Sequence, residues 1–507
     1  MSSFHPSHLP RTLLATLTLA TSVAGAQTFR FVPSLTITET LTNNVNLAPS
    51  SSAKSDLISA FSPGFSISEQ SARTRLTGDV SLPILIYARS SENDRVLPQV
   101  NITGNIEAVD RWLYVDGNAN VSQQYVSPFG ARPVDIQNNN QNRYTAQSYS
   151  LTPYLKRDLP GEMQVEIRDG NTWTKLNNAP ASDTTAYTNV VSALLSRKPL
   201  PLGWDATYSR SEVKFGSQPL VTQVARGNLV YQADPELQLS LRGGYEDDDL
   251  GLTQSRSSIY GVGAIWQPNA RTKVNGYWEH RFFGSSYQAG WNYRTALFAW
   301  DASFSRDITT LPQQLAAGAG LVDTRTLLNQ LFLTQFPDPI QRQLFIDQYI
   351  IEHGLSQFSP NPEALFTNQV YLTQQASTSV GLLGVRNAIF LTLFHVRTEV
   401  FASNTDNADT ASQFNNNTQI GGTLVWSHNL ASDLSFIATA TAARTTGNGN
   451  AAQAGTSRQE SVNLSLTSSI GAKTSLSAGA RYYVVRSDLA EKVQESAIFV
   501  TVSHAFR

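Results

Sequence analysis

The sequence predicts an all-β fold: a transmembrane antiparallel up-and-down β-barrel of roughly 22 strands, with a small helical insertion in one outer loop. Three observations predict it. From Phe29 onward, stretches of roughly ten to fourteen residues alternate apolar and polar side chains, as strands tilted across a bilayer require. Short turns alternate with long polar loops. The chain ends in an amphipathic strand, Gln494–Arg507.

Residues 1–26 have the pattern of a secretory signal peptide. Arg11 precedes a short apolar run, and Ala24–Ala26 provides small residues for cleavage. We therefore expect an exported chain in which residues 27–507 form the barrel. No later stretch offers some 18 consecutive apolar residues, which excludes a transmembrane helix from the mature chain.

Composition narrows the class of protein further. The chain is 41% hydrophobic, carries a formal net charge of -2 and contains no cysteine. A near-neutral chain gives no electrostatic reason to expect nucleic acid as a partner. The missing cysteines exclude a disulfide framework, which barrels of the bacterial outer membrane commonly do without. The expected location is therefore the bacterial outer membrane.

The alternation that predicts strands is clearest in the second half of the chain. In the segment Leu237–Tyr245, Leu239 and Leu241 lie on one face, while Ser240 and Arg242 lie on the other. Several later segments repeat this pattern. We expect the apolar face to meet lipid and the polar face to line a lumen.

The connections give an internal check on the strand count. Tight turns such as Leu159–Gly161 and Pro268–Ala270 alternate with long polar loops such as 43–55 and 127–142. Outer-membrane barrels have short turns on the periplasmic side and long loops outside. Counted from Phe29, every long loop falls outside and the last strand ends in the periplasm. An odd number of miscounted strands would break this parity.

Soluble all-β folds fit the chain less well. The strands of β-sandwiches average about five or six residues, and this many strands would need several domains. No linker rich in proline and glycine separates such domains, and no short regular repeat indicates a β-helix.

The stretch 311–367 departs from the strand pattern. Val322, Leu327, Leu328 and Leu331 follow helical spacing, and a second helical segment begins after Pro339. We expect a helical hairpin inserted in an outer loop, packed on itself and on the barrel mouth or lumen. Two roles remain open: a lid that restricts passage, or a cap that only stabilises the rim.

Aromatic residues near segment ends are expected at the two membrane interfaces, where a ring with a polar edge is satisfied. They are Trp112, Tyr125, Tyr144, Tyr154, Trp173, Trp204, Tyr245, Trp266, Trp278, Trp291, Trp300 and Trp426.

Charged residues inside predicted strands are candidates for the lumen wall, because a charge facing lipid costs about 2–4 kcal/mol at mid-membrane. Two explanations remain open. They line a passage in which arginine binds acidic glycans, or they form ion pairs that brace the wall. The candidates are Glu166, Arg168, Lys273, Glu279, Arg281, Arg294 and Arg481.

No pattern of catalytic residues or cofactor ligands stands out. The histidines of the mature chain are scattered singly, and the HExxH, GxSxG and phosphate-loop motifs do not occur. We therefore expect no enzyme activity, no cofactor and no metal site. The acidic run Asp247–Asp249 is placed in an outer loop, where it either attracts a divalent cation or is only solvated.

One stretch is more particular than alternation requires. Asp110–Pro133, DRWLYVDGNANVSQQYVSPFGARP, resembles a family of outer-membrane β-barrel proteins associated with exosortase (PEP-CTERM) systems, as do the N-terminal residues from Phe31 through Ser68. The family accompanies exopolysaccharide biosynthesis genes and has no established activity. The resemblance thus implies the fold and the location, and gives function only a genomic context.

The expected function is a channel, or an accessory, for the passage of a polar polymer such as exopolysaccharide. The alternative is a structural or glycan-binding surface barrel without transport. Expected partners are outer-membrane lipid and the barrel-assembly machinery, which reads the terminal strand through Phe506, Val502 and Val500. This strand should close against the first strand, around Phe29–Leu41.

Overall fold

The fold of the 507-residue chain is seen in a computed structural model. The predicted signal peptide, residues 1–26, and Arg507 lie outside the residues that the structure describes. The described residues are 28–133, 135–139, 141–177, 184–214, 219–251, 254–310, 313–314, 324–338, 341–343, 345–346, 349, 370–402, 416–448, 455–471, 473–488 and 490–506.

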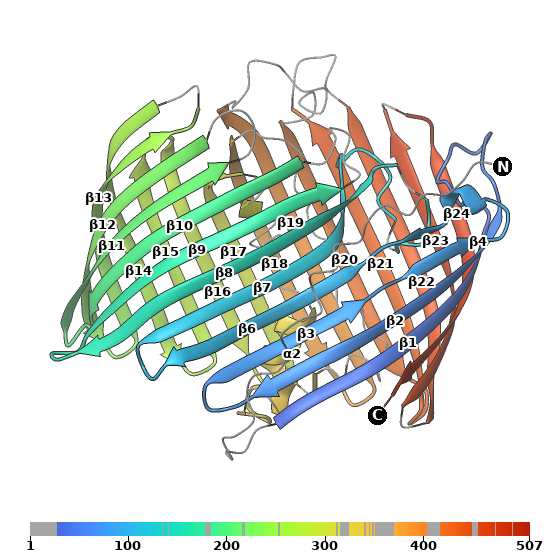
Figure 1. The fold of residues 1–507 in the computed structure, drawn as a ribbon, viewed down its shortest axis with the longest axis horizontal. Helices are drawn as coiled ribbons and strands as arrows, with labels where there is room; N and C mark the ends of the chain where they lie inside the picture. Colours follow the sequence, from blue (N-terminus) through green and yellow to red (C-terminus); the bar gives the residue numbers. More distant parts are fainter. Residues whose placement is uncertain are drawn as a thin grey trace.

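The strands form one closed sheet (Figure 1). In chain order, the helix α2 (Thr324–Phe332) follows β17 and precedes β18. A short 3-10 turn, η1 (Ser91–Asn93), follows β4. The strands are β1 (Thr28–Thr42), β2 (Asp56–Gln70), β3 (Thr74–Ser81), β4 (Ile84–Tyr87), β5 (Arg95–Val96), β6 (Gln99–Val109), β7 (Leu113–Tyr125), β8 (Arg143–Leu159), β9 (Met163–Asn177), β10 (Thr184–Arg197), β11 (Leu202–Lys214), β12 (Pro219–Asp234), β13 (Leu237–Asp249), β14 (Gln254–Asn269), β15 (Thr272–Arg281), β16 (Gly284–Arg294), β17 (Phe298–Thr309), β18 (Val370–Leu383), β19 (Asn387–Ala402), β20 (Asn417–Asn429), β21 (Leu434–Gly447), β22 (Thr456–Gly471), β23 (Thr474–Ser487) and β24 (Val493–Ala505).

The barrel closes where the last strand pairs with the first. β24 runs antiparallel to β1, with Ser34 opposite Ala505 and Thr42 opposite Ala497. Every other pairing around the wall is antiparallel as well, which leaves no free sheet edge along the seam between Ser34 and Thr42. The predicted partner of the terminal strand is therefore confirmed.

The wall has 22 strands, as predicted. β3 and β4 count as one of them, because both pair with β2 in succession. The break falls at Leu82–Pro83, where proline has no N–H to donate to the ladder. β5 pairs with β4 and forms with it a short hairpin above the end of β3. No helix among the described residues is long and apolar enough to cross a membrane.

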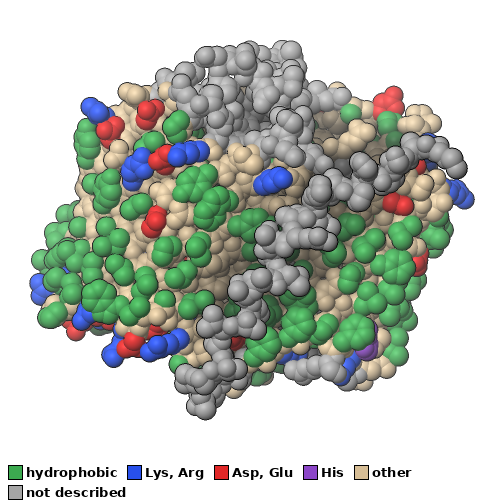
Figure 2. All heavy atoms as spheres, in the orientation of Figure 1, with side chains coloured by type: hydrophobic (Ala, Val, Ile, Leu, Met, Phe, Trp, Pro, Cys, Tyr) green, Lys and Arg blue, Asp and Glu red, His purple; other side chains and the backbone are tan. Residues whose placement is uncertain are grey.

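The wall has two faces of opposite character. On β22 the outward Val462, Leu464 and Leu466 are 43–46% exposed, whereas the inward Gln459 and Ser461 are 6% exposed. Hydrophobic side chains cover much of the outer surface, and most charged side chains gather toward its two margins (Figure 2). Alternation in the sequence therefore becomes an apolar exterior around a polar lumen.

The two ends of the barrel differ in their connections. One end carries the short turns, such as Pro160–Glu162 and Ala270–Arg271, together with the C-terminus. The other carries the long connections, including 43–55 and 126–142. We call these the turn end and the loop end.

The helical insertion lies in the predicted loop and packs inside the lumen. The chain leaves β17 at the loop end, but α2 lies toward the turn end (Figure 1), where its buried Leu328 and Leu331 pack with Ala299 and Leu383. Ala299 is the second residue of β17 and Leu383 ends β18, so both mark the turn end. The helix of the insertion therefore packs in the lumen, which is one of the two places that the sequence left open, and not at the outer mouth. The second predicted helical segment lies mostly outside the described residues.

The aromatic belt is confirmed only in part. Trp112, Trp173 and Trp266 are 44–48% exposed on the outer surface. Tyr144 is buried, however, and Tyr154 stacks on an inward tyrosine at 5.1 Å. Both rings lie on the lumen face, so their assignment to a membrane interface is wrong. Proximity to a strand end does not say which way a ring points.

The terminal aromatic residue gives a testable prediction for assembly. Phe506 is 47% exposed on the outer surface, and its ring meets that of His504 at 4.7 Å. An aromatic anchor stabilises a strand end at the membrane interface. We expect Phe506→Ala to lower the fraction of folded, heat-modifiable barrel several-fold more than deletion of Arg507 does. Equal losses from the two changes would contradict this.

Candidate functional site: a polar lumen with internal elements at both ends

The loop between β7 and β8, residues 126–142, folds inward and crosses the lumen at the loop end. The backbone N–H of Arg132 donates to the Tyr483 hydroxyl on β23 at 2.6 Å. The Gln459 side chain on β22 donates to the Gly130 carbonyl at 2.8 Å. These strands lie far around the wall from β7 and β8, so the loop spans much of the opening.

The near side of the same loop is held by β5. Arg95 donates to the Asn139 side chain at 2.6 Å, to the Asn138 carbonyl at 2.8 Å and to the Tyr87 hydroxyl at 2.8 Å. Hydrogen bonds on both sides satisfy the polar groups of a loop that lies inside the barrel rather than in water. We call residues 126–142 the mouth loop.

A buried ion pair fastens the mouth loop to the seam. Arg481 of β23 donates to the Glu495 carboxylate of β24 at 2.8 Å and 3.1 Å, and forms a salt bridge with Asp135 of the loop. Asn138 of the loop contacts both Arg481 and Glu495. It accepts a hydrogen bond from Arg481 at 3.0 Å and donates one to Glu495 at 3.0 Å. The side chains of Arg481 and Glu495 are 8% and 0% exposed. We call this group the seam latch; Thr42 completes it with a 2.7 Å donation to Glu495.

A second ionic group lies on the wall from β12 to β15. Glu279, 1% exposed, forms salt bridges with Arg242 at 2.8 Å and with Arg226 at 3.3 Å. Arg242 also lies over the Tyr277 ring, with its guanidinium carbon 4.0 Å from the ring centre. Two arginines on one buried carboxylate hold both arginine side chains against the wall.

Arg281 at the end of β15 bridges two more carboxylates. It contacts Glu246 of β13 and Asp307 of β17, each at 2.8 Å. Glu246 also accepts from the Phe282 backbone N–H at 2.8 Å. The side chains of Arg281 and Glu246 are 7% and 0% exposed, so this group is deeply desolvated.

The first predicted pair, Glu166 and Arg168, is in contact on β9. Arg168 donates to Glu166 at 2.6 Å and to Asp116 of β7 at 3.2 Å, and it lies over Tyr154 at 4.0 Å. The Glu166 and Arg168 side chains are 20% and 36% exposed, so water in the lumen screens them more than it screens Arg281.

The remaining two candidates lie near the turn end. Arg294 of β16 donates to Thr334, just beyond α2, at 3.2 Å and to the Ala270 carbonyl at 3.1 Å. Lys273 of β15 is exposed and makes no ion pair with any described residue. All seven candidates therefore lie on the lumen face, but the structure distributes them among five separate places rather than one site.

The lower part of the insertion forms an apolar plug at the turn end. Leu327, Leu328 and Leu331 of α2 are 0–2% exposed and pack on the wall. Phe345 and Tyr349 lie against Phe332, with ring centres 4.7 Å and 5.3 Å apart. Burial raises the pKa of Tyr349 to about 12, so its hydroxyl stays protonated.

The acidic run Asp247–Asp249 lies in β13, not in an outer loop, so its predicted position is wrong. Asp247 forms a salt bridge with Arg256 at 3.1 Å on the outer face. Asp248 faces the lumen and is completely buried.

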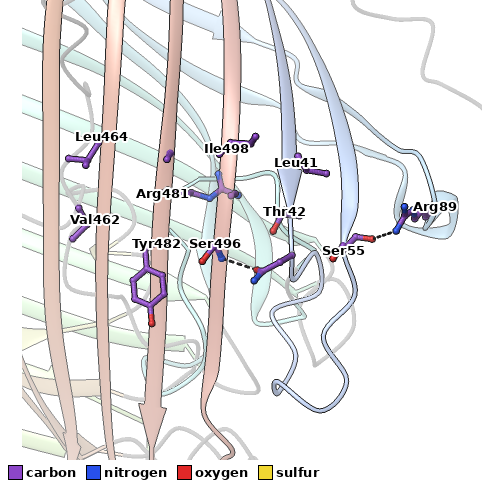
Figure 3. Close-up of a pocket in the computed structure, with 13 residues that line it drawn as sticks. Leu41, Thr42, Ser55, Arg89, Val462, Leu464, Arg481, Tyr482, Ser496 and Ile498 are labelled. Carbon is purple, nitrogen blue, oxygen red and sulfur yellow. Dashed lines mark hydrogen bonds between the residues drawn. The ribbon is translucent and has the colours of Figure 1, made fainter.

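A groove of about 800 Å³ lies beside the seam on the outer surface (Figure 3). Leu41, Val462 and Ile498 give it an apolar floor, and Ser55, which accepts from Arg89 at 3.5 Å, lies at its polar margin. This composition suits contact with membrane lipid rather than transport, because the groove opens away from the lumen.

Sequence reasoning missed the partners of the arginines. Glu246 and Asp248 have the same parity as Arg242 within β13, so alternation alone would have assigned them to the lumen. Asp135 and Asn138 belong to the mouth loop, which has no periodic pattern that could have placed them.

A comparison with solved structures supports the barrel fold. No family model matches the chain, and no curated protein matches its sequence. The FrpB iron transporter from Neisseria meningitidis (F5-1 variant, apoprotein form) superimposes with a TM-score of 0.51 at 9% identity, covering 94% of this chain and 81% of that one. The siderophore receptor PirA from Pseudomonas aeruginosa gives 0.44 at 10% identity, with 94% and 81% covered. OccK3 (OpdO) from Pseudomonas aeruginosa gives 0.33 at 11%, with 94% and 96% covered.

The closed wall of 22 strands, its apolar exterior and its polar interior define an outer-membrane β-barrel, and the chain is located in the bacterial outer membrane. The turn end is then periplasmic and the loop end faces the cell exterior. The resemblance to the exosortase-associated family is not supported by a family match and remains a prediction.

Proposed function

We propose that this barrel is a passage through the outer membrane for a polar polymer, and that it carries out no covalent chemistry on the polymer. One observation carries the proposal. A polar lumen holds two internal elements at opposite ends, the mouth loop outside and the α2 plug on the periplasmic side. A wall that served only as a scaffold would gain more stability from an apolar core than from buried ion pairs.

The charged side chains that line the wall indicate which kind of polymer the lumen suits. Arg168, Arg226, Arg242, Arg281 and Arg481 all contact carboxylates. These arginines brace the wall, so they do not form a cationic track for an acidic glycan. A polymer rich in hydroxyl groups suits such a lining, because hydroxyls both donate and accept hydrogen bonds. The family resemblance suggests exopolysaccharide as that polymer.

The proposal includes two partners. Outer-membrane lipid covers the apolar exterior, and the barrel-assembly machinery reads the terminal strand through the outward Val500, Val502 and Phe506. These side chains are 40–47% exposed on the outer surface, where another protein or lipid can reach them.

Deleting the gene in the native bacterium tests the proposed function. We expect polysaccharide to accumulate in the periplasm while the secreted fraction falls several-fold, and the intact gene should restore secretion. The measurement is the polymer content of the periplasmic and culture fractions. Unchanged secretion, combined with a loss of glycan binding by intact cells, would instead favour a surface barrel without transport.

A further inference from the structure

A cavity of about 150 Å³ lies in the lumen near its outer end, bounded by strands from β11 around to β18. A water molecule takes about 30 Å³, so the space suits one small polar ring rather than a single solvent molecule. Its polar lining is Ser211, Thr222, Arg281, Asp307, Thr309, Thr310 and Gln313, and its apolar lining is Val213, Leu220, Leu250, Ile308 and Val370.

The polar groups of this cavity retain hydrogen-bonding capacity. Asp307 accepts from Arg281 and from the Ile308 N–H through Oδ1, and among the described residues its Oδ2 has no partner. Gln313 accepts from the Thr310 N–H and hydroxyl at 2.9 Å and 3.0 Å through its amide oxygen, which leaves its NH₂ group to donate. A carboxylate oxygen and an amide NH₂ in one small space offer an acceptor and a donor to a ligand hydroxyl.

The wall beside the cavity carries excess negative charge. Asp248 lies opposite Thr222 in the β12–β13 register and two residues before Leu250, and both of these neighbours line the cavity. Asp248 is completely buried, and within the described part of the chain neither of its carboxylate oxygens has a hydrogen-bond partner. Leaving a buried carboxylate without a partner costs free energy that a cationic group would recover.

The charges do not balance locally. Among the described residues, the connected group holds four carboxylates, Glu246, Asp248, Glu279 and Asp307, and three arginines, Arg226, Arg242 and Arg281. The carboxylates therefore outnumber the arginines by one, and Asp248 is the carboxylate that no arginine of this described group contacts. A ligand for this cavity should therefore bring a positive charge together with its hydroxyl groups.

We propose that the cavity is a binding subsite for an amino-sugar unit, a ring that carries hydroxyls and one protonated amine. The amine meets Asp307, the carboxylate that lines the cavity, with Asp248 buried in the wall beside it. Gln313 and the threonine hydroxyls take the ring hydroxyls, and Leu220 and Leu250 cover the apolar ring face. A metal ion fits less well, since no three His, Cys, Asp or Glu side chains of the described residues gather to hold one. This proposal rests on the proposed passage only for its assumption that the ligand belongs to a polymer.

Calorimetric titration of the purified full-length barrel in detergent tests the proposal with two probes. One is the fully deacetylated glucosamine pentamer, and the other is its neutral N-acetylated counterpart. We expect the cationic pentamer to bind at least about tenfold more tightly, with an affinity that falls as salt rises. Equal affinity for the two probes, or no binding of either, would overturn the proposal.

Variants localise the binding. Asp248→Asn and Asp307→Asn should each weaken binding of the cationic pentamer about tenfold. The matched control is Asp116→Asn, which removes a lumen carboxylate of the Arg168 group on another part of the wall. If Asp248→Asn does not fold, Gln313→Ala, on the cavity surface, should still weaken binding. Unchanged affinity in the folded cavity variants, or an equal loss in the control, would overturn the site.

This titration is independent of transport. A barrel that binds the cationic pentamer but conducts nothing would contradict the passage and leave the subsite standing. A barrel that conducts but binds neither probe would contradict the subsite and leave the passage standing.

Discussion

Arg481→Ala is expected to destabilise the barrel by about 3–5 kcal/mol and to release the mouth loop, because removing one partner of a buried ion pair leaves the other charge uncompensated. Glu495 is 0% exposed and would keep only Asn138 and Thr42 as hydrogen-bond partners among the described residues. Asp135 would lose the arginine that ties the loop to β23. The measurements are the free energy of unfolding in denaturant and protease cleavage within residues 126–142 of the folded barrel.

Arg486→Ala is the matched control for this prediction. Arg486 lies on the same strand and contacts Glu460 at 3.1 Å, but both side chains are about half exposed, at 52% and 53%. Exposed pairs contribute about 0–1 kcal/mol, so this variant should unfold close to the wild type and keep the mouth loop protected. Equal destabilisation by the two substitutions would contradict the account of the seam latch.

Leu328→Ala is expected to detach the plug at the periplasmic end. Leu328 is 0% exposed within the cluster that joins α2 to the wall, and removing a buried leucine side chain costs about 2–5 kcal/mol. A nine-residue helix has little stability of its own, so the loss should appear as local unfolding. The measurement is protease cleavage within residues 324–338 while the barrel remains heat-modifiable.

Leu333→Ala is the control for the plug. Leu333 follows α2 directly but is 36% exposed, so its truncation should change local stability by no more than about 0.5 kcal/mol. Cleavage at the same rate in Leu328→Ala and Leu333→Ala would show that the packed face of α2 does not hold the plug in place.

Much of the wall could be predicted from the sequence because the direction of each strand side chain depends only on its position within that strand. Each strand has one face toward lipid and one toward the lumen. Apolar residues at every second position, such as Val462, Leu464 and Leu466, identify both faces in the sequence. The same parity places Arg168 and Arg281 inside. Closure of β24 on β1 followed from the need to pair every edge.

The contents of the lumen could not be predicted in the same way, because they depend on contacts far apart in the sequence. Asp135 meets Arg481 across hundreds of residues, and no spacing in the mouth loop announces the contact. Helical spacing identified Leu327 and Leu328, but the end of the barrel at which they pack depends on the path of the connecting chain through the lumen. The ring of Tyr144 points inward for a similar reason, since its position near a strand end says nothing of its face.

The central claim is that the lumen is a passage obstructed from within, and planar-bilayer conductance tests it most directly. The full-length barrel should conduct little, because the mouth loop and the α2 plug lie in its lumen. A heat-modifiable variant that lacks residues 311–367 should carry currents several-fold larger. No conductance from either protein, once both are shown to be folded and inserted, would contradict the claim.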